Sequence, residues 1–221
     1  MKVKGFILKS KNLGENLRQI VVFSDKLGML NLIVKTNKIP FPLSVDLFSL
    51  SQFELVQIGE RFEVKQVKLI EHNFPKSFRH FVYMSKIAKL LSQFPLAKNE
   101  KLFQMVERYL KITEKFNLAY TMFLVKFAFV EGIFPILNRC AVCKKTIGKD
   151  EEVGGFSIKH SGIVCFNCKD NHALKWNLKD SKLTIKLAKE SFHKAKTQKL
   201  ANAQLGRIRS TFEKYVVERL Q

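Results

Sequence analysis

The four cysteines of the chain are the residues best suited to chemistry, because they form two pairs with the spacing of metal ligands. Each pair is a Cys-x-x-Cys turn, which brings two sulfurs within reach of one cation, and 21 residues separate the pairs. Two such pairs complete the tetrahedral shell of a structural zinc and leave no position for a catalytic water. The sequence therefore predicts a closed zinc site at Cys140, Cys143, Cys165 and Cys168.

The alternative to a metal site is a pair of disulfides, which requires an oxidising compartment. The first residues follow a strand-like pattern with no apolar leader and cleavage site, so zinc is preferred. His160 and His172 flank the second pair, and we expect surface positions for both because four thiolates already fill the shell. Arg139, Lys144 and Lys145 lie beside the first pair and would offset its negative charge.

The chain that must position these cysteines is strongly basic. Among 221 residues, 39 Lys and Arg oppose 19 Asp and Glu, for a net charge of +20. A/T-rich codon usage would raise the Lys content, but it does not explain the shortage of acids. The charge is spread, with +4, +6, +2 and +8 on residues 1–75, 76–138, 139–168 and 169–221. A broad nucleic-acid-binding face is therefore expected, rather than a basic tail.

No membrane contact is expected. The most apolar stretch, residues 118–137, contains Lys126 and Glu131, which a membrane span would not accommodate cheaply. We interpret this stretch as a buried helix of a soluble protein.

The first 75 residues alternate like β-strands and are punctuated by Gly and Asp turns. Five short strands in about 70 residues predict a small barrel of the OB type, although the pattern fits an SH3-like barrel equally well. The expected strands are Val3–Lys11, Leu17–Asp25, Gly28–Lys35, Leu47–Ile58 and Phe62–Glu71.

The hydrophobic period then changes from two to that of a helix. Pro75 is placed to start the first helix, whose expected apolar stripe includes Phe78, Phe81 and Val82. Asn99, Asn117 and Ser181 are the expected N-caps of helices over 100–113, 118–134 and 181–196, and a last helix covers 205–216. These aromatic stripes are expected to be core. The predicted class is α+β, with an OB-fold nucleic-acid-binding domain at 1–75 and a helical domain at 76–221 that carries the zinc insertion at about 138–172.

Catalytic signatures are absent from the sequence. It contains no phosphate loop, no dinucleotide fingerprint, no His-Glu-x-x-His and no nucleophile elbow. NAD-dependent DNA ligases combine an OB fold with a four-cysteine zinc site, but they need a Lys-x-Asp-Gly motif that does not occur here. A binding protein is expected rather than an enzyme.

Three stretches, Gly14–Ser24, Phe134–Cys143 and Phe156–Cys165, together resemble the bacterial recombination mediator family RecO. The run Gly14–Ser24 resembles that family's Gly-Glu-x-x-Arg strand, and Phe134–Cys143 resembles the helix end that leads into its first cysteine pair. Phe156–Cys165 resembles the approach to the second pair, and the order of these stretches extends over nearly the whole chain. The segment after the third strand departs from the family pattern, because it is short and keeps only Lys35 and Lys38 as its basic residues.

The resemblance implies a cytoplasmic bacterial protein of DNA repair and recombination. Such a protein binds single- and double-stranded DNA and anneals complementary strands without ATP. It contacts the acidic C-terminal tail of single-strand binding protein and, with RecR, helps to load RecA. The alternative is an RNA- or ribosome-associated zinc protein with an OB fold, which a preference for RNA in competition would favour.

Phosphate contacts are expected mainly on the barrel, from Arg18, Lys35, Lys38, Lys9 and Lys11. Arg18 matches the arginine of the family's Gly-Glu-x-x-Arg run, so Arg18→Ala is expected to weaken single-strand binding and lower its salt dependence. Phe6, Phe23 and Phe53 are candidates for base stacking, with core packing the preferred role for each.

Overall fold

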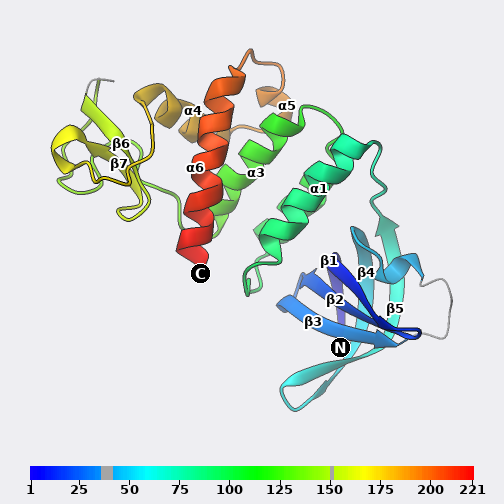
Figure 1. Cartoon of the computed structure of the whole chain (residues 1–221). Helices are drawn as coiled ribbons and strands as arrows, with labels where there is room; N and C mark the ends of the chain where they lie inside the picture. The colour runs from blue at the N-terminus through cyan, green and yellow to red at the C-terminus, as the bar shows by residue number, and fades with distance from the viewer. Residues whose placement is uncertain (36–41, 150–151) are drawn as a thin grey trace. The chain divides into compact units, whose positions relative to one another are not determined.

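The computed structural model describes residues 1–35, 42–149 and 152–221 and divides the chain into two compact units, Met1–Glu114 and Lys115–Gln221 (Figure 1). The first unit contains five strands and two helices. They are β1 (Lys2–Gly14), β2 (Leu17–Ser24), β3 (Gly28–Lys35), β4 (Ser49–Ile58), β5 (Arg61–His72), α1 (Phe78–Leu91) and α2 (Glu100–Leu110), with a 3-10 turn, η1, at Leu43–Val45.

The strands form one antiparallel sheet in the order β3-β2-β1-β4-β5. The edge strands β3 and β5 approach each other, so the sheet curls into the predicted five-stranded OB-fold barrel. In β3 the residues from Leu30 to Lys35 are alternately buried and exposed, as expected for a strand with one face on a core. The barrel core is made of apolar side chains from four strands and from η1, namely Val3, Ile7, Ile20, Val22, Leu30, Leu32, Val34, Val45, Phe53 and Leu55.

Helices α1 and α2 belong to the same compact unit as the barrel. The ring of Phe103 on α2 lies 5.0 Å from that of Phe6 and 6.1 Å from that of Phe23. Gly28 (φ +73°) sits directly against the chain before α2, where a Cβ atom would come within 2.3 Å of the Leu96 carbonyl oxygen. The two helices therefore cover one end of the barrel.

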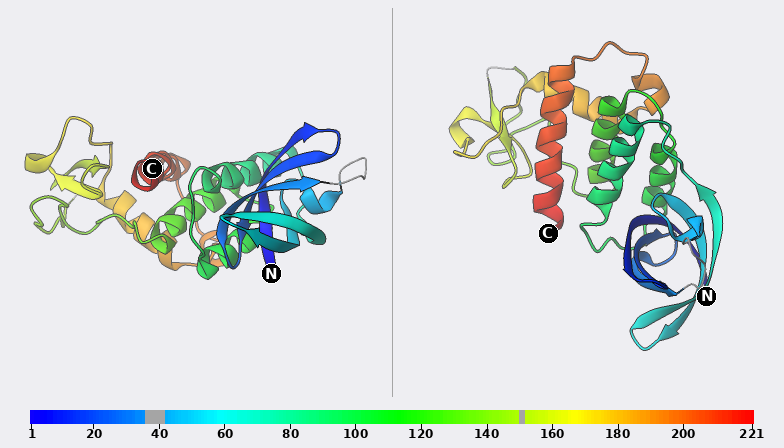
Figure 2. Two further views of the ribbon diagram at one scale, coloured as in Figure 1. Left: turned by 90° about the horizontal axis from the view of Figure 1, so that it is seen from below. Right: turned by 45° about the vertical axis from the view of Figure 1, so that its right-hand side comes forward.

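The second unit is helical with a small hairpin inserted. Its elements are α3 (Phe116–Val130), β6 (Val153–Ser157), β7 (Gly162–Cys165), the 3-10 turn η3 (Phe166–Cys168), α4 (Leu178–Lys189), α5 (Phe192–Ala195) and α6 (Asn202–Leu220). Helix α3 is buried nearly all round and packs against α4 and α6, and both views in Figure 2 show α6 beside it. No helix among the described residues is long and apolar enough to cross a membrane.

Three predicted helix starts are wrong, and each real start has a local cause. Helix α1 begins after Ser77 rather than at Pro75, because the Ser77 hydroxyl accepts a hydrogen bond from the His80 N–H. Asn117 lies inside α3. This helix begins after Lys115, and the backbone of Lys115 is in the left-handed region. The expected helix 181–196 is two helices, α4 and α5, separated by an extended Glu190.

The cap of α4 is Asn177, in a reciprocal capping box with Asp180, while Ser181 accepts a hydrogen bond from the Trp176 indole at 2.9 Å. The Asn99 cap and the helix that it starts are confirmed.

Candidate metal centre and nucleic-acid interface

The first cysteine pair lies on a tight backbone turn. The Lys144 N–H donates to the Cys140 carbonyl oxygen at 3.0 Å, and the Cys140 N–H donates to the Lys145 carbonyl oxygen at 2.8 Å. Lys144 closes the turn in the left-handed region, at φ +65°. This local conformation turns both sulfurs of the pair to the same side.

The second pair lies at the end of the β6–β7 hairpin. Cys165 is the last residue of β7, and the 3-10 turn η3 places Cys168 beside it. Gly162 is required at the start of β7, because a Cβ atom there would come within 2.4 Å of the Ile136 carbonyl oxygen. The Ala141 N–H donates to the Ile163 carbonyl oxygen at 2.8 Å, so β7 holds the first turn next to the second.

The four sulfurs converge as the spacing predicts. All four lie within 4.8 Å of one another, and the Sγ atoms of Cys143 and Cys165 are 3.9 Å apart. A tetrahedral zinc with bonds of about 2.3 Å to sulfur requires ligands about 3.8 Å apart, so this donor set fits the ion. None of the four cysteines forms a disulfide. The shell consists of thiols alone, and the two expected surface histidines are not part of it.

Peptide groups control the acidity of the thiols. Burial by itself raises the pKa of Cys140, but the N–H groups of Cys165, Cys143 and Val142 approach its sulfur and together lower that pKa to about 6. The hydrogen bond shared with Cys165, together with burial, raises the pKa of Cys168 to about 12. A cation beside the Cys168 sulfur would favour its ionised form, and a bound dication would supply that charge, because a coordinated thiol is deprotonated outright.

The positive side chains next to the first pair have partners of their own. The Lys144 ammonium donates to the Ala141 carbonyl oxygen at 2.7 Å, which keeps one cation at the turn. Lys145 faces Glu152 at 3.8 Å, and because Lys145 is well exposed and Glu152 is partly exposed, this ion pair adds little stability.

On the barrel, strand register separates the expected DNA contacts into two faces. Opposed residues of antiparallel strands share a face, and Lys9 pairs with Val21 while Lys11 pairs with Gln19. The chain of pairs continues to β3, where Lys35 lies opposite Leu17. Lys9, Lys11 and Lys35 are therefore exposed on one outer face that spans β1 to β3.

Arg18 lies on the other face of the sheet. It pairs with Asn12 on β1 and with the buried Val34 on β3. Its Nε donates to the Asn12 side-chain oxygen at 3.0 Å, and its Nη1 lies 3.6 Å from the Asp46 carboxylate. Lys38, the fifth expected contact, lies outside the described residues.

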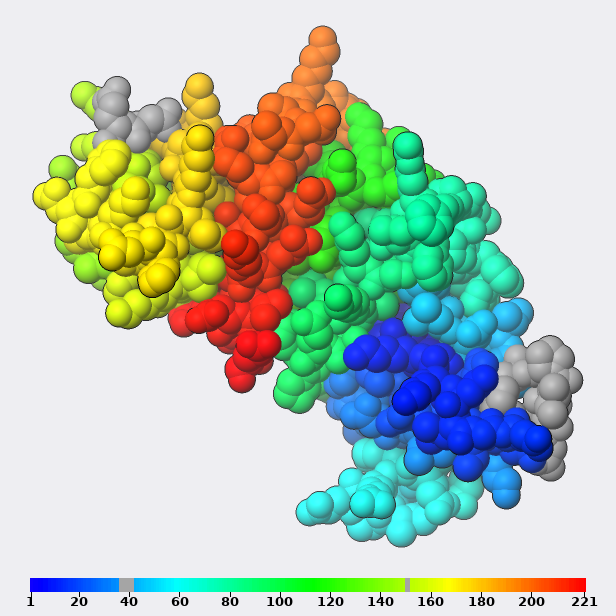
Figure 3. All heavy atoms as spheres, viewed as in Figure 1, coloured from blue at the N-terminus to red at the C-terminus, as the bar shows by residue number. Residues whose placement is uncertain are grey.

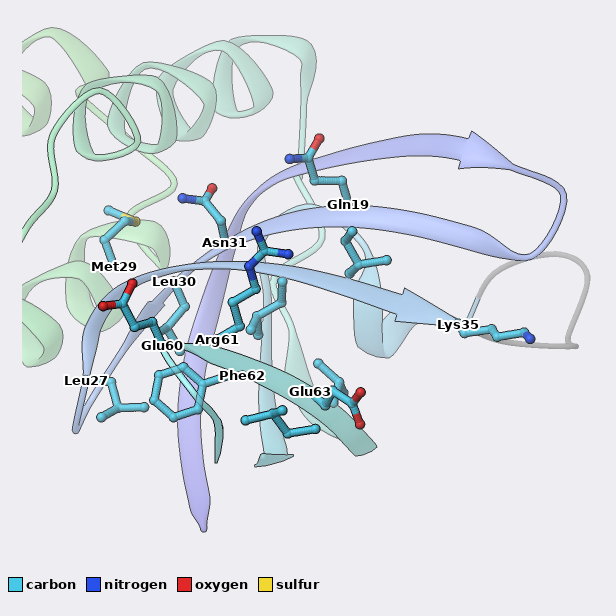
Figure 4. Close-up of a pocket in the computed structure, with 14 residues that line it drawn as sticks. Gln19, Leu27, Met29, Leu30, Asn31, Lys35, Glu60, Arg61, Phe62 and Glu63 are labelled. Carbon is cyan, nitrogen blue, oxygen red and sulfur yellow. The ribbon is translucent and has the colours of Figure 1, made fainter. Parts of the chain in front are cut away.

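A cleft of about 1030 Å³ opens between β3 and the β4–β5 turn (Figure 4). Gln19, Asn31 and Lys35 line it from the β2–β3 side. Glu60, Arg61 and Phe62 line it from the turn, which extends beyond the body of the barrel (Figure 3). Figure 4 shows Lys35 at one end, pointing away from Phe62, while Arg61 reaches toward β3.

Of the polar lining residues, Lys35 was an expected DNA contact, whereas Arg61, Gln19 and Asn31 were not expected at a site. No local sequence pattern could have identified them, because they come together only when β3 and β5 close the barrel. Two cations, Lys35 and Arg61, and two carboxylates, Glu60 and Glu63, line the cleft, so its lining has no net charge.

The aromatic side chains also differ from expectation in one helix. Phe6, Phe23 and Phe53 are buried in the first unit, which confirms their core role. The stripe predicted to be the core face of α1 is wrong at its start, because Phe78 is 79 % exposed and Phe81 is 42 % exposed, and it is confirmed at its end, where Ala88, Leu90 and Leu91 are buried. The buried face of α1 begins instead with His80, Tyr83 and Met84.

The fold and the metal centre define a class of protein: an OB-fold barrel joined to a helical unit that holds a four-cysteine ribbon. A family model described as recombination protein O C terminal matches residues 77–221, about two thirds of the chain. The chain therefore belongs to the RecO family.

Similarity to individual relatives extends through the barrel. The DNA repair protein RecO of Caldanaerobacter subterraneus subsp. tengcongensis is 27 % identical over 233 residues, covering 99 % of this chain and 90 % of the relative. The protein of the same name from Mesoplasma florum is 30 % identical over 181 residues, covering 76 % and 67 %. That of Alkaliphilus metalliredigens is 27 % identical over 201 residues, covering 85 % and 79 %.

Proposed function

We propose that this chain acts in DNA repair as a recombination mediator that binds single- and double-stranded DNA and anneals complementary strands. The observation that carries the proposal is the similarity along both units to proteins named DNA repair protein RecO. The mediator helps to load RecA, together with RecR, onto DNA coated by single-strand binding protein, whose acidic C-terminal tail it contacts. It works in the bacterial cytoplasm.

Charge supports this proposal in both units. Residues 1–114 carry 19 basic and 10 acidic groups, for +9, and residues 115–221 carry 20 and 9, for +11. Annealing requires that the phosphates of two strands be screened at once, and a protein with cations on both units does this without a nucleotide cofactor. The exposed lysines at positions 9, 11 and 35 offer one phosphate-binding track, with the adjoining cleft as a place for bases.

The proposed mediator is not an enzyme, and the metal centre supports this. Four thiolates around one zinc leave no coordination position for substrate or water. We propose that the ion is a structural zinc, held by Cys140, Cys143, Cys165 and Cys168, which ties the two turns together. It supplies folding energy to the ribbon and no chemistry to DNA.

The proposal is tested by annealing two complementary labelled oligonucleotides, one precoated with single-strand binding protein, with no nucleotide added. The protein is expected to accelerate annealing, and the acceleration is expected to fade as salt rises. Single-strand affinity should fall by about 0.7 log units per log unit of salt for each phosphate neutralised.

The same assay is run with an RNA competitor of identical sequence. Stronger competition by RNA than by DNA, or intact binding with no acceleration of annealing, contradicts the mediator function. Either result favours an RNA- or ribosome-associated role.

A further inference from the structure

The exposed aromatic side chains of this protein are concentrated at one place. Among the described residues, five phenylalanines are exposed, and three of them, Phe74, Phe78 and Phe81, lie within eight residues of one another. This segment joins β5 to the first turn of α1 (Figure 1). By contrast, the exposed large apolar residues of β1 to β5 among the described positions are all aliphatic.

Two of the three rings, those of Phe74 and Phe81, are held against neighbouring rings, and the segment that carries all three is attached to the barrel. Asn73 is buried and donates to the Phe48 carbonyl oxygen at 3.0 Å, which fixes the end of β5 to the barrel. The Phe74 ring lies 4.0 Å from that of His72, and the Phe81 ring meets that of Phe48 edge-on at 5.9 Å. Phe78 is 79 % exposed, one turn before Val82 on the same helix face. Rings that are both fixed and exposed mark a surface that another molecule covers.

The charge around this aromatic platform (Phe74, Phe78 and Phe81) suits a polyphosphate. The segment 72–99 contains five Lys or Arg and no acidic residue. Lys76 and Arg79 are exposed beside the rings, and Lys86 and Lys89 continue the Phe78–Val82 face along α1. The rise of a helix places Lys86 about 12 Å beyond Phe78 along the axis. The nearest acid on β5, Glu71, is neutralised by Lys111 at 2.8 Å.

We propose that this aromatic platform stacks unpaired bases of single-stranded DNA while the flanking lysines and arginine bind its backbone. The proposal rests on the DNA-binding function above and adds a second contact surface, outside the barrel cleft. Every base presents a π-face, so the site is sequence-tolerant. Bases held by their faces keep their pairing edges open, which is the arrangement that a complementary strand needs.

The test measures binding of a fluorescein-labelled oligothymidine of about 16 nucleotides, the upper site size of one OB fold, by anisotropy. Phe78→Ala and Phe74→Ala are compared with Phe129→Ala, which removes an equally exposed ring (63 %) from the second unit. Each platform variant is expected to weaken binding by about 5-fold to 100-fold, as for loss of one stacked base, with the salt slope unchanged. The Phe129→Ala variant and duplex binding by all variants should be unaffected, because a duplex hides its base faces.

A spectroscopic readout separates stacking from a structural role. Trp176, the single tryptophan, is buried, so Phe78→Trp adds an exposed fluorophore at the platform. Oligothymidine is expected to quench the added fluorescence, and the same substitution at Phe129 should show no quenching. Binding without quenching overturns the proposal, as does an equal loss of duplex affinity in Phe78→Ala.

Two further outcomes would assign the surface elsewhere. Unchanged oligonucleotide affinity in both platform variants overturns the proposal and leaves a docking surface for a protein. Self-association of the wild type that Phe78→Ala abolishes would assign the platform to a second copy of the chain. Failure of the wild type itself to bind the oligonucleotide would instead refute the proposed DNA-binding function.

Discussion

At the scale of single residues, the basic side chains of the barrel differ in the face of the sheet on which they lie and in their contacts within the protein. Lys9, Lys11 and Lys35 extend from one outer face, whereas Arg18 lies on the other, beside Asn12 and Asp46. A side chain that already has protein partners must give up part of them to bind phosphate, so its measured contribution includes that loss. The variant of Arg18 therefore needs a measurement of stability in addition to the charge control that serves for the lysines.

Lys35→Ala and Arg18→Ala are each expected to remove one phosphate contact. Each should lower the slope of log affinity against log salt by about 0.7 on single strands and weaken binding several-fold. Lys159→Ala, a loss of the same charge on the β6–β7 turn, is the control and should change neither the affinity nor the slope comparably.

Thermal unfolding of Arg18→Ala is measured in parallel, because its partly exposed ion pair with Asp46 contributes at most about 1 kcal/mol. An unchanged slope in Arg18→Ala would remove this residue from the DNA site, and the same result in Lys35→Ala would remove the outer face.

At the scale of elements, local patterns were sufficient to predict the strands and the convergence of the four cysteines. The alternation of apolar residues in Gly28–Lys35 reflects one strand on one core, and each cysteine pair needs only its own turn. The helix N-caps were harder to predict. Asn117 and Ser181 are suitable residue types for a cap, but their side chains accept hydrogen bonds from Arg209 and Trp176 instead.

The sequence did contain a signal for the exposed face of α1, because Arg79, Lys86 and Lys89 share a helix face with Phe78 and Val82. The prediction gave more weight to the large apolar side chains than to this charge pattern, and in the structure Met84 and Ile87 form the buried face instead. The platform for bases was not predicted, because exposed aromatic rings on a charged face were assigned to the core.

The ribbon of residues 137–174 is expected to depend on a bound metal more than the neighbouring helices do. The β6–β7 hairpin has two short strands, which are marginal alone, while structural zinc contributes on the order of 10 kcal/mol in small metal domains. Chelation, or Cys165→Ser, is expected to remove one zinc per chain and abolish amide exchange protection in β6 and β7. Protection of barrel strand β1 should remain.

Acidification should act in the same direction as chelation, because thiols must lose their protons to bind the ion and metal affinity therefore falls as pH falls. Re-addition of zinc at neutral pH is the control and should restore protection. Full protection of the hairpin in a zinc-free sample would show that the ribbon folds without a metal.

At the scale of the whole molecule, the end of the first unit differs from the domain boundary expected after residue 75. The compact unit continues to Glu114 because α2 supplies Phe103 to the rings of Phe6 and Phe23. A hydrogen bond also joins β3 to the segment before α2, because the Met29 N–H donates to the Leu96 carbonyl oxygen at 2.8 Å. Whether 1–75 folds as a domain by itself stays a prediction that fragments can decide.

A fragment of residues 1–114 is expected to unfold cooperatively, whereas a fragment of residues 1–75 exposes Phe6 and Phe23 at the barrel end. Burying a phenylalanine contributes about 1.5–3 kcal/mol, so losing cover from two costs about 3–6 kcal/mol, comparable to the whole stability of a small domain. Urea unfolding of the two fragments measures the difference. Equal stability would place the boundary at residue 75 and make α1 and α2 additions to a self-sufficient barrel. A large difference would mean that the barrel and the aromatic platform on α1 fold as one DNA-binding unit, because the core that stabilises one also fixes the other.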